Sequence, residues 1–375
     1  MSLSVAVLRE QADGERRVAL DPASANQLAR SGFQVLVEKS AGEAAGFADE
    51  QYADCVLLDD PELIVTMADI WLWVQMPATE QLANLPDGRL GIGLVYPHRS
   101  PAITATLNQH HHTCLAMELV PCNNRTRSMD VLSSQATIAG YSAVLRAAQL
   151  APRVFPMLTT PAGTLNPARV VVIGAGVAGL QAIATARRLG ARVEVYEPGP
   201  IARETVESLG ALLISADTAK VDGTGLDEKP ARDDQHQVSE KLTECLAGAD
   251  VVISTVALPG ISAPKLISKA MLDGMQAGSV IVDLAAESGG NCELTVPGET
   301  MTHNGVVVDG PLNLASEAAN HASVMYARSL LDVLDLVVDG ESIVVNRDSE
   351  VIDGILLTHD GKLVQRDAIE PPANA

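Results

Sequence analysis

A short apolar segment that leads directly into a glycine-rich turn constrains the fold of this chain more than any other feature. Residues 170–173 are expected to form a buried strand, and the turn GAGVAG follows at 174–179. A helical pattern comes next, and a second apolar strand at 192–196 ends just before the acidic residue Glu197. This order of strand, G-x-G-x-x-G turn, helix, strand and acid predicts a βαβ unit that binds a dinucleotide.

Each part of this segment has a physical task in such a unit. Gly174 permits the tight turn, Gly176 lets the backbone approach a pyrophosphate, and Gly179 lets the helix pack closely on the strand. The helix that begins at Val177 offers unpaired N–H groups and a partial positive charge to the phosphates. Glu197 lies where a carboxylate accepts hydrogen bonds from the adenosine ribose. These five residues are our candidates for binding the cofactor.

The acid also predicts which dinucleotide binds. The carboxylate of Glu197 would repel the additional phosphate of NADP, so we expect NAD(H). Arg203, a few residues further on, argues the other way, because a guanidinium can reach a phosphate. The alternative interpretation of the whole segment is a glycine-rich turn in an ordinary α/β domain.

Composition restricts the class of protein. A chain of 375 residues predicts two domains, and 47% hydrophobic content with only 3% aromatic residues favours parallel sheets covered by helices. The net charge of −21 argues against binding of nucleic acid. The five cysteines are widely spaced and include no C-x-x-C pair, which predicts reduced thiols and no metal site. No apolar window is long enough to span a bilayer, so no direct membrane insertion is expected.

The apolar pattern predicts two α/β domains with parallel sheets, both similar to a Rossmann fold. A helix over 133–150 is expected to bridge them, and Asp21 is expected to cap a helix over 22–31. Expected strands cover 4–8, 34–38, 70–74, 90–95 and 113–118 in the first domain and 170–173, 192–196, 212–215, 251–255, 279–284 and 306–309 in the second.

The C-terminal segment is expected to complete the first domain. A helix is predicted over 315–336, and strands with a hairpin at His359-Asp360-Gly361 are predicted between 343 and 364. The first domain would then be discontinuous, with residues 1–132 and 330–375, and residues 133–329 would form the NAD(H)-binding domain. Residues 219–237 are polar and contain two glycines and a proline, which predicts a long surface loop.

A polar segment before the bridging helix is a candidate for contact with the nicotinamide. It carries Arg125, Arg127, Asp130 and Ser133. Asp130 and Ser133 are three residues apart, so they can share one face at the start of a helix. The alternative is that Asp130 is a helix cap with no contact to a ligand.

Two further candidate segments follow apolar strands of the second domain. They cover residues 254–260 and 283–291, and they include Gly260 and Leu284. Ligands of parallel sheets bind beyond the carboxyl ends of the strands, which is where both segments are expected. The alternative for the glycine pair at 289–290 is a plain turn.

At this point the sequence resembles a known family. The segments LREQADGERRVALDP, SMDVLSSQATIAGY, VVVIGAGVAGLQAIATARRLGA, ALPGISAPKLI and AGSVIVDLAAESGGNCELTVPGE are similar to the NAD(H)-binding domain of proton-translocating nicotinamide nucleotide transhydrogenase. The resemblance covers nearly the whole chain. Alanine dehydrogenase is related to this family and shares its two-domain plan.

The resemblance implies hydride transfer between NADH held by this chain and NADP⁺, with the NADP(H) held by a partner subunit. A membrane component would couple the transfer to proton movement. It further implies a homodimer, and a cytoplasmic polypeptide that is peripheral to the inner membrane through its partner subunits. Asp130 and Ser133 match residues that orient the nicotinamide carboxamide, so we assign them, with Arg125 and Arg127, to the catalytic site.

The chain departs from the family at two positions around the nicotinamide. Cys122 replaces the first arginine of the family loop and Arg127 replaces its glutamine, whereas Arg125 matches the second arginine. We hypothesise that Arg127 or Arg125 supplies the missing cation. The loop 219–237 also lacks the tyrosine with which the family closes over NAD(H). A catalytically divergent paralogue is therefore an alternative.

A self-contained alanine-type dehydrogenase and a redox-sensing NAD(H)-binding module are also compatible with these motifs. An alanine dehydrogenase uses a lysine and a histidine to handle protons. Here Gln75 stands at the lysine position, and His98 lies near the histidine region in a differently shaped loop. Because an amide cannot carry a proton, Gln75 argues against an amino-acid substrate. Arg17 matches both families and does not discriminate between them.

Overall fold

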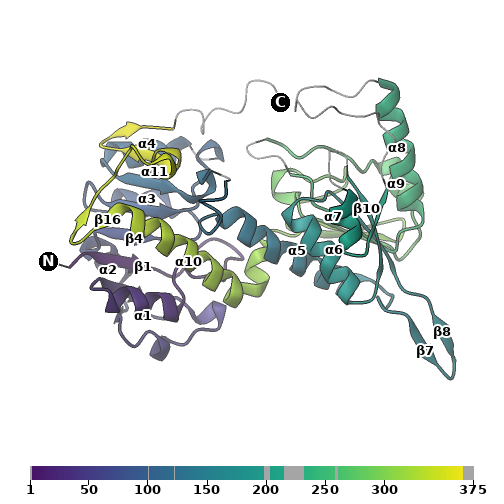
Figure 1. Ribbon diagram of the computed structural model, residues 1–375, viewed down its shortest axis with the longest axis horizontal. Coiled ribbons are helices and arrows are strands. Elements are labelled where there is room, and N and C mark those ends of the chain that lie inside the picture. The colour runs from purple at the N-terminus through teal and green to yellow at the C-terminus, as the bar shows by residue number, and fades with distance from the viewer. Residues whose placement is uncertain are drawn as a thin grey trace. The chain divides into compact units, whose positions relative to one another are not determined.

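The computed structural model describes residues 2–99, 101–121, 123–197, 203–214, 232–257 and 261–365, with the backbone alone for 232–239. The chain divides into two compact units, each with its own large sheet (Figure 1). The first unit comprises residues 1–135 and 315–375, and the second comprises residues 136–314. The first domain is therefore discontinuous, as the sequence predicts.

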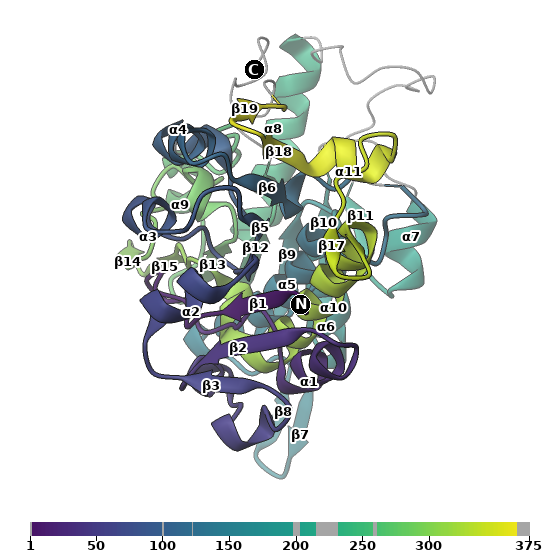
Figure 2. The same cartoon turned by 90° about the vertical axis from the view of Figure 1, so that its left-hand side faces the viewer.

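The first unit contains a sheet with the strand order β19-β18-β6-β5-β4-β1-β2-β3 (Figure 2). At one edge, β18 (Leu356–His359) pairs antiparallel with β6, and β19 (Lys362–Leu363) pairs antiparallel with β18. The C-terminal hairpin thus completes this sheet as predicted. The parallel strands are β1 (Ser4–Val7), β2 (Gln34–Glu38), β3 (Val56–Leu58), β4 (Ile70–Leu72), β5 (Leu90–Gly93) and β6 (Thr113–Ala116).

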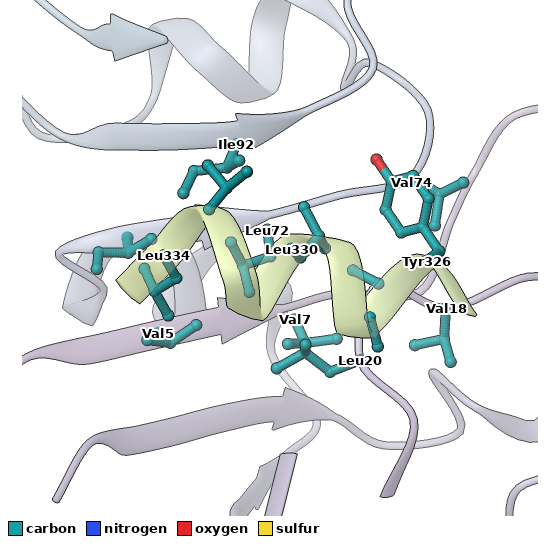
Figure 3. Close-up of a cluster of buried hydrophobic side chains, with 14 of the residues drawn as sticks. Val5, Val7, Val18, Leu20, Leu72, Val74, Ile92, Tyr326, Leu330 and Leu334 are labelled. Carbon is teal, nitrogen blue, oxygen red and sulfur yellow. The ribbon is translucent and has the colours of Figure 1, made fainter. Parts of the chain in front are cut away.

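Helices cover both faces of this sheet because its strands are apolar on both faces. Tyr326, Leu330 and Leu334 of α10 (Ala319–Val337) are buried on one face against Val7 and Leu72 (Figure 3). The same face holds α1 (Pro22–Arg30) and α11 (Glu350–Ile355), and the opposite face holds α2 (Pro61–Met67), α3 (Thr79–Ala83) and α4 (Pro101–Gln109).

The start of α1 agrees with its prediction, whereas the domain boundary near α10 does not. The side chain of Asp21 accepts a hydrogen bond from the N–H of Ala23 at 3.1 Å, so the predicted N-cap of α1 is confirmed. The second segment of the unit begins at Ala315, whereas the sequence placed the boundary at residue 330. The reason is that α10 packs on this core along its whole length, so a boundary within the helix would divide one packing surface.

The second unit contains a sheet with the order β11-β10-β9-β12-β13-β15-β14, parallel except for the last pair. Its strands are β9 (Arg169–Ile173), β10 (Arg192–Tyr196), β11 (Leu212–Ile214), β12 (Val251–Ser254), β13 (Val280–Asp283), β14 (Thr300–His303) and β15 (Val306–Asp309). The helices are α5 (Val131–Leu150), which begins in the first unit, α6 (Val177–Arg188), α7 (Arg203–Ser208), α8 (Arg232–Ala247) and α9 (Lys269–Asp273).

Buried residues of α5, α6 and α7 pack on one face of this second sheet, and those of α8 and α9 pack on the other. The helix α8 corrects the prediction of a loop over 219–237, because helical backbone already begins at residue 232. Residues 219–231 of that loop lie outside the described residues. The sequence explains the error, since the first residues of α8, RDDQHQ, are all polar and have the composition of a loop.

Several short elements complete the two units. The hairpin of β7 (Leu158–Thr160) and β8 (Gly163–Leu165), which was not predicted from the sequence, projects from the second unit (Figure 1). The expectation of strands alone between 343 and 364 is wrong, because α11 lies within this range. Further pieces are η1 (Glu43–Ala45), η2 (Asp49–Gln51), η3 (Pro97–Arg99), η4 (Met117–Leu119), η5 (Ala286–Ser288), η6 (Leu314–Ala318), β16 (Val338–Asp339) and β17 (Ser342–Ile343).

Candidate functional site

The glycine turn, residues 174–179, connects β9 to α6 in the second unit. Gly174 has a φ of +93°, and a Cβ there would lie only 2.6 Å from Oγ1 of Thr255. A Cβ on Gly179 would overlap the carbonyl oxygen of Gly174. Both positions therefore require glycine for the turn and for the close packing of α6 on the strand.

Gly176 differs from these two glycines. It is the N-cap of α6, is exposed, and has a negative φ of −70°. Apart from Gly176 and its neighbours along the chain, no atom of the described residues lies within 4 Å of where its Cβ would be. The fold therefore does not demand glycine here, and the space in front of Gly176 and Val177 suits a group that approaches the helix N-terminus.

Glu197 follows β10 and reaches the glycine turn. The parallel register pairs Tyr196 with Ile173, which brings the next residue of each strand to the same edge of the sheet. A carboxylate oxygen of Glu197 accepts a short hydrogen bond from the N–H of Ala175. Arg203, which the sequence left as a possible phosphate ligand, lies in α7, 3.4 Å from the carboxylate of Glu207. The acid thus contacts the turn directly.

Thr255, which follows β12, contacts the backbone at the start of the glycine turn. Its hydroxyl lies 3.1 Å from the carbonyl oxygen of Ile173 and 3.2 Å from that of Gly174, and it can donate to either. Thr255 lies in a predicted candidate segment, but this role was not predicted. The available signal was a hydroxyl residue placed directly after an apolar strand.

The segment after β13 is organised by the buried carboxylate of Asp283. This group accepts hydrogen bonds from the N–H groups of Ala285, Asn291 and Cys292 at 3.1, 2.7 and 3.0 Å. Gly290 has a φ of +81°, and a Cβ there would lie 2.7 Å from the Asp283 carboxylate. The glycine pair at 289–290 is therefore a tight structural turn.

Of the two cofactor candidates in these segments, the structure describes one. Leu284 is half-buried, and its N–H donates to the carbonyl oxygen of Ser254 at 2.9 Å, which ties the ends of β12 and β13 together. Gly260 lies outside the described residues.

The polar turn, residues 123–130, precedes α5 in the first unit. Asp130 accepts hydrogen bonds from the N–H of Ser133 at 2.9 Å and from its hydroxyl at 2.7 Å. The structure therefore brings these two predicted site residues together, and Asp130 acts as the N-cap of α5. The cap also fixes the position of its own carboxylate, so capping and ligand contact are compatible roles.

The two arginines of the polar turn are exposed. One guanidinium nitrogen of Arg127 lies 3.4 Å from the side-chain oxygen of Asn124, and the backbone N–H of Arg125 donates to Asn123 at 2.9 Å. The structure does not bring either guanidinium to Asp130 by a described hydrogen bond. Cys122 lies outside the described residues.

A buried network surrounds Arg17 in the first unit. Two nitrogens of the Arg17 guanidinium donate to the two carboxylate oxygens of Glu15 at 2.8 and 2.6 Å, and the third donates to Gln135 at 2.8 Å. Gln75 donates to Glu15 at 3.1 Å. Arg17 is only 3% exposed, and the Glu15 side chain is fully buried. Burial by itself lowers the pKa of Arg17, but the hydrogen bond and charge of Glu15 outweigh this and raise it.

Glu10 lies beside this network, shortly after the end of β1. Its carboxylate accepts hydrogen bonds from the N–H groups of Val74 and Gln75 at 2.7 and 3.0 Å. Burial raises the pKa of Glu10 to about 8, despite these two hydrogen bonds, and the charge of Glu15 adds to the rise. His98 lies in η3, and burial followed by the charge of Arg99 lowers the pKa of its imidazole.

Comparisons with known proteins agree with this architecture. Family models described as alanine dehydrogenase/PNT match residues 6–139 as the N-terminal domain and residues 143–366 as the C-terminal domain. An NAD(P) transhydrogenase subunit alpha polypeptide of Rhodospirillum rubrum is 37% identical over 96% of this chain and 98% of its own length. The alanine dehydrogenase of Halomonas elongata is 29% identical over 98% of this chain and 96% of its own length.

A solved structure shows the same fold. The crystal structure of transhydrogenase from Sinorhizobium meliloti aligns with a TM-score of 0.88 at 38% identity and covers 96% of this chain and all of that one. The likeness extends over both units, so it includes the discontinuous first domain as well as the glycine turn.

Proposed function

Because the chain belongs to the alanine dehydrogenase/PNT family, we propose that it is the NAD(H)-binding alpha subunit of an NAD(P) transhydrogenase. It transfers hydride between NADH and NADP⁺ as one part of a complex. The relatives named as transhydrogenase alpha subunits are more similar to it than the alanine dehydrogenase, at 37% against 29% identity.

The network around Arg17 is the observation that carries the choice between these two functions. An amino-acid dehydrogenase needs a cation for the substrate carboxylate and a group that carries protons. The Arg17 guanidinium donates to Glu15 and Gln135, so the buried Glu15 carboxylate already balances its charge, and the Gln75 amide at the lysine position is neither an acid nor a base near neutral pH. Direct hydride transfer between two nicotinamide rings requires neither group.

The residues of the second unit fit an NAD(H) cofactor. The exposed N-terminus of α6 at Gly176 and Val177 suits the pyrophosphate, and the Glu197 carboxylate suits the adenosine ribose. Leu284 and Gly260 complete our assignment of cofactor contacts in this unit. The nicotinamide supplies or receives the hydride when the cofactor is bound. The protein contributes position and the exclusion of water.

We assign the nicotinamide side of the site to the polar turn of the first unit. The Asp130 carboxylate, fixed by Ser133, can accept hydrogen bonds from the carboxamide of the cofactor. Arg127 or Arg125 supplies the positive charge that the family places at the position of Cys122. Their exposure leaves both guanidiniums free to turn towards a ligand.

The partners follow from the same assignment. NADP(H) is held by a second subunit, and a membrane component links the reaction to proton movement, with this chain in the cytoplasm beside the inner membrane. In the part of the chain that the structure describes, no helix is long and apolar enough to cross a bilayer. We also propose a homodimer, supported by the β7–β8 hairpin and the residue before it, where Leu165 is 54% and Met157 is 64% exposed.

The first experiment mixes the purified chain with the NADP(H)-binding subunit of a transhydrogenase, NADPH and an oxidised NAD analogue, and follows hydride transfer by absorbance. Transfer that requires both proteins supports the proposal. Turnover of NADH with pyruvate and ammonia by this chain alone would instead identify an amino-acid dehydrogenase. NADH binding without transfer to any acceptor would identify a binding module.

A further inference from the structure

Asn291 is a fully buried amide at the carboxyl ends of β12 and β13, and the site described above does not use its side chain. Its side-chain oxygen accepts hydrogen bonds from the hydroxyl of Ser254 at 2.7 Å and from the N–H of Val256 at 3.1 Å. Its side-chain nitrogen donates to the carbonyl oxygens of Val256 at 2.8 Å and of Pro264 at 2.9 Å. Only an amide side chain can do both here, because its oxygen accepts two hydrogen bonds while its nitrogen donates two.

The backbone of Asn291 joins the same two segments. Its N–H donates to the Asp283 carboxylate at the end of β13, and its carbonyl oxygen accepts from the N–H groups of Leu266 and Ile267 at 2.8 and 3.0 Å. The residue therefore ties the segment after β12 to the segment after β13. In a parallel sheet these are the segments that border the ligand crevice.

The same contacts lead to the glycine turn. Ser254 and Val256, which Asn291 binds, flank Thr255, and the Thr255 hydroxyl contacts the carbonyl oxygens of Ile173 and Gly174. The Val256 side chain would lie 3.0 Å from a Cβ on Gly174, so this segment packs directly against the turn. A shift of residues 254–256 therefore moves the surface on which the turn rests.

We infer that Asn291 is a positioning residue for NAD(H) binding, which acts through residues 254–256 on the glycine turn. The inference rests on the proposed NAD(H) function of this chain. Asn291 touches no reacting atom, so its role is in the affinity for NADH rather than in the hydride-transfer step. Loss of its side chain should allow several alternative placements of the segment, only some of which match the cofactor.

A matched pair of serine variants tests this inference. Ser254→Ala removes the bond to Asn291 at the carboxyl end of β12, and Ser279→Ala removes a bond of 2.8 Å to the carbonyl oxygen of Ala249, before β13 at the opposite end of the sheet. Both serines are buried, at 0% and 2% exposure. Each variant loses one buried hydrogen bond, so both should become less stable to urea by similar amounts.

The full-length proteins are titrated with NADH by fluorescence, and hydride transfer is measured at saturating NADH. We expect the Kd for NADH to rise about threefold in Ser254→Ala and about tenfold in Asn291→Ala, which are the losses expected for one and for several hydrogen bonds. In both variants the transfer rate at saturation should remain close to that of the wild type. Ser279→Ala should bind NADH as the wild type does.

An unchanged Kd in Ser254→Ala and Asn291→Ala, with lowered stability, would overturn the inference and leave Asn291 a purely structural residue. An equal rise in Kd for Ser279→Ala would overturn it as well, because binding would then follow stability alone. If Asn291→Ala does not fold, the serine pair decides. A wild-type chain that does not bind NADH would refute the proposed function itself, which is a separate outcome.

Discussion

The glycine turn of the second unit and the polar turn of the first unit both precede a helix, but different forces shape them. In the glycine turn the constraint is steric, because a Cβ on Gly174 would contact the Thr255 side chain and a Cβ on Gly179 would overlap the backbone of Gly174. In the polar turn the backbone is held by side-chain hydrogen bonds, such as those from Ser133 to Asp130. Steric requirements and helix caps can be inferred from sequence order, whereas hydrogen-bond partners that lie far apart in the sequence cannot.

Substitutions in the glycine turn should have the largest effect. Gly179→Ala places a Cβ against the carbonyl oxygen of Gly174, which is backbone and cannot move aside. We expect a loss of about 4–5 kcal/mol in the free energy of unfolding, or failure to fold, because overpacking against backbone is among the costliest changes. Urea unfolding measures this.

Gly176→Ala is the matched control in the same turn. Its Cβ meets no atom within 4 Å among the described residues beyond its neighbours along the chain, so the stability should stay within about 0.5 kcal/mol of the wild type. NADH affinity should fall nonetheless, because the Cβ occupies the side from which the pyrophosphate approaches. A Gly176→Ala protein that binds NADH normally would contradict the placement of the cofactor.

The second-largest effect is expected in the buried network of the first unit. Glu15→Gln leaves the Arg17 guanidinium without its counter-charge at 3% exposure. Removal of one partner of a buried ion pair lowers the free energy of unfolding by about 3–5 kcal/mol. We expect a decrease near the lower end of this range because Gln135 still binds Arg17. Thermal and urea unfolding measure it. Arg203→Ala, which removes one partner of an exposed pair, should cost less than about 1 kcal/mol.

A smaller effect should appear as a dependence of stability on pH. Glu10 has its pKa raised from 4.5 to about 8, so the folded protein holds a proton that the unfolded chain has lost. The free energy of unfolding should therefore fall as the pH rises from about 4.5 to 8 and level off above that. Glu10→Ala should flatten this slope. A wild-type stability that is constant or rising over this range would contradict the burial of the Glu10 carboxylate.

The sequence predicted both sheets and the discontinuous first domain because apolar strands and a G-x-G-x-x-G turn carry their own pattern. It did not predict that the whole of α10 belongs to the first unit, since the apolar pattern of a helix does not show which sheet the helix covers. It also missed the pairing of Glu15 with Gln75 and the contacts of Thr255. Those groups are up to 82 residues apart in sequence, and only strand register brings them together.

The arginines of the polar turn should have the smallest effect on stability. Arg127→Ala and Arg125→Ala each remove an exposed side chain, so both proteins should unfold within about 0.5 kcal/mol of the wild type. Hydride transfer with the NADP(H)-binding subunit should nevertheless be lost in the variant whose guanidinium replaces the family's arginine at the position of Cys122. The comparison of Arg127→Ala with Arg125→Ala shows which of the two guanidiniums this is. Unchanged transfer in both variants would show that the site works without a cation from this turn, and that the two arginines are ordinary solvent-exposed residues.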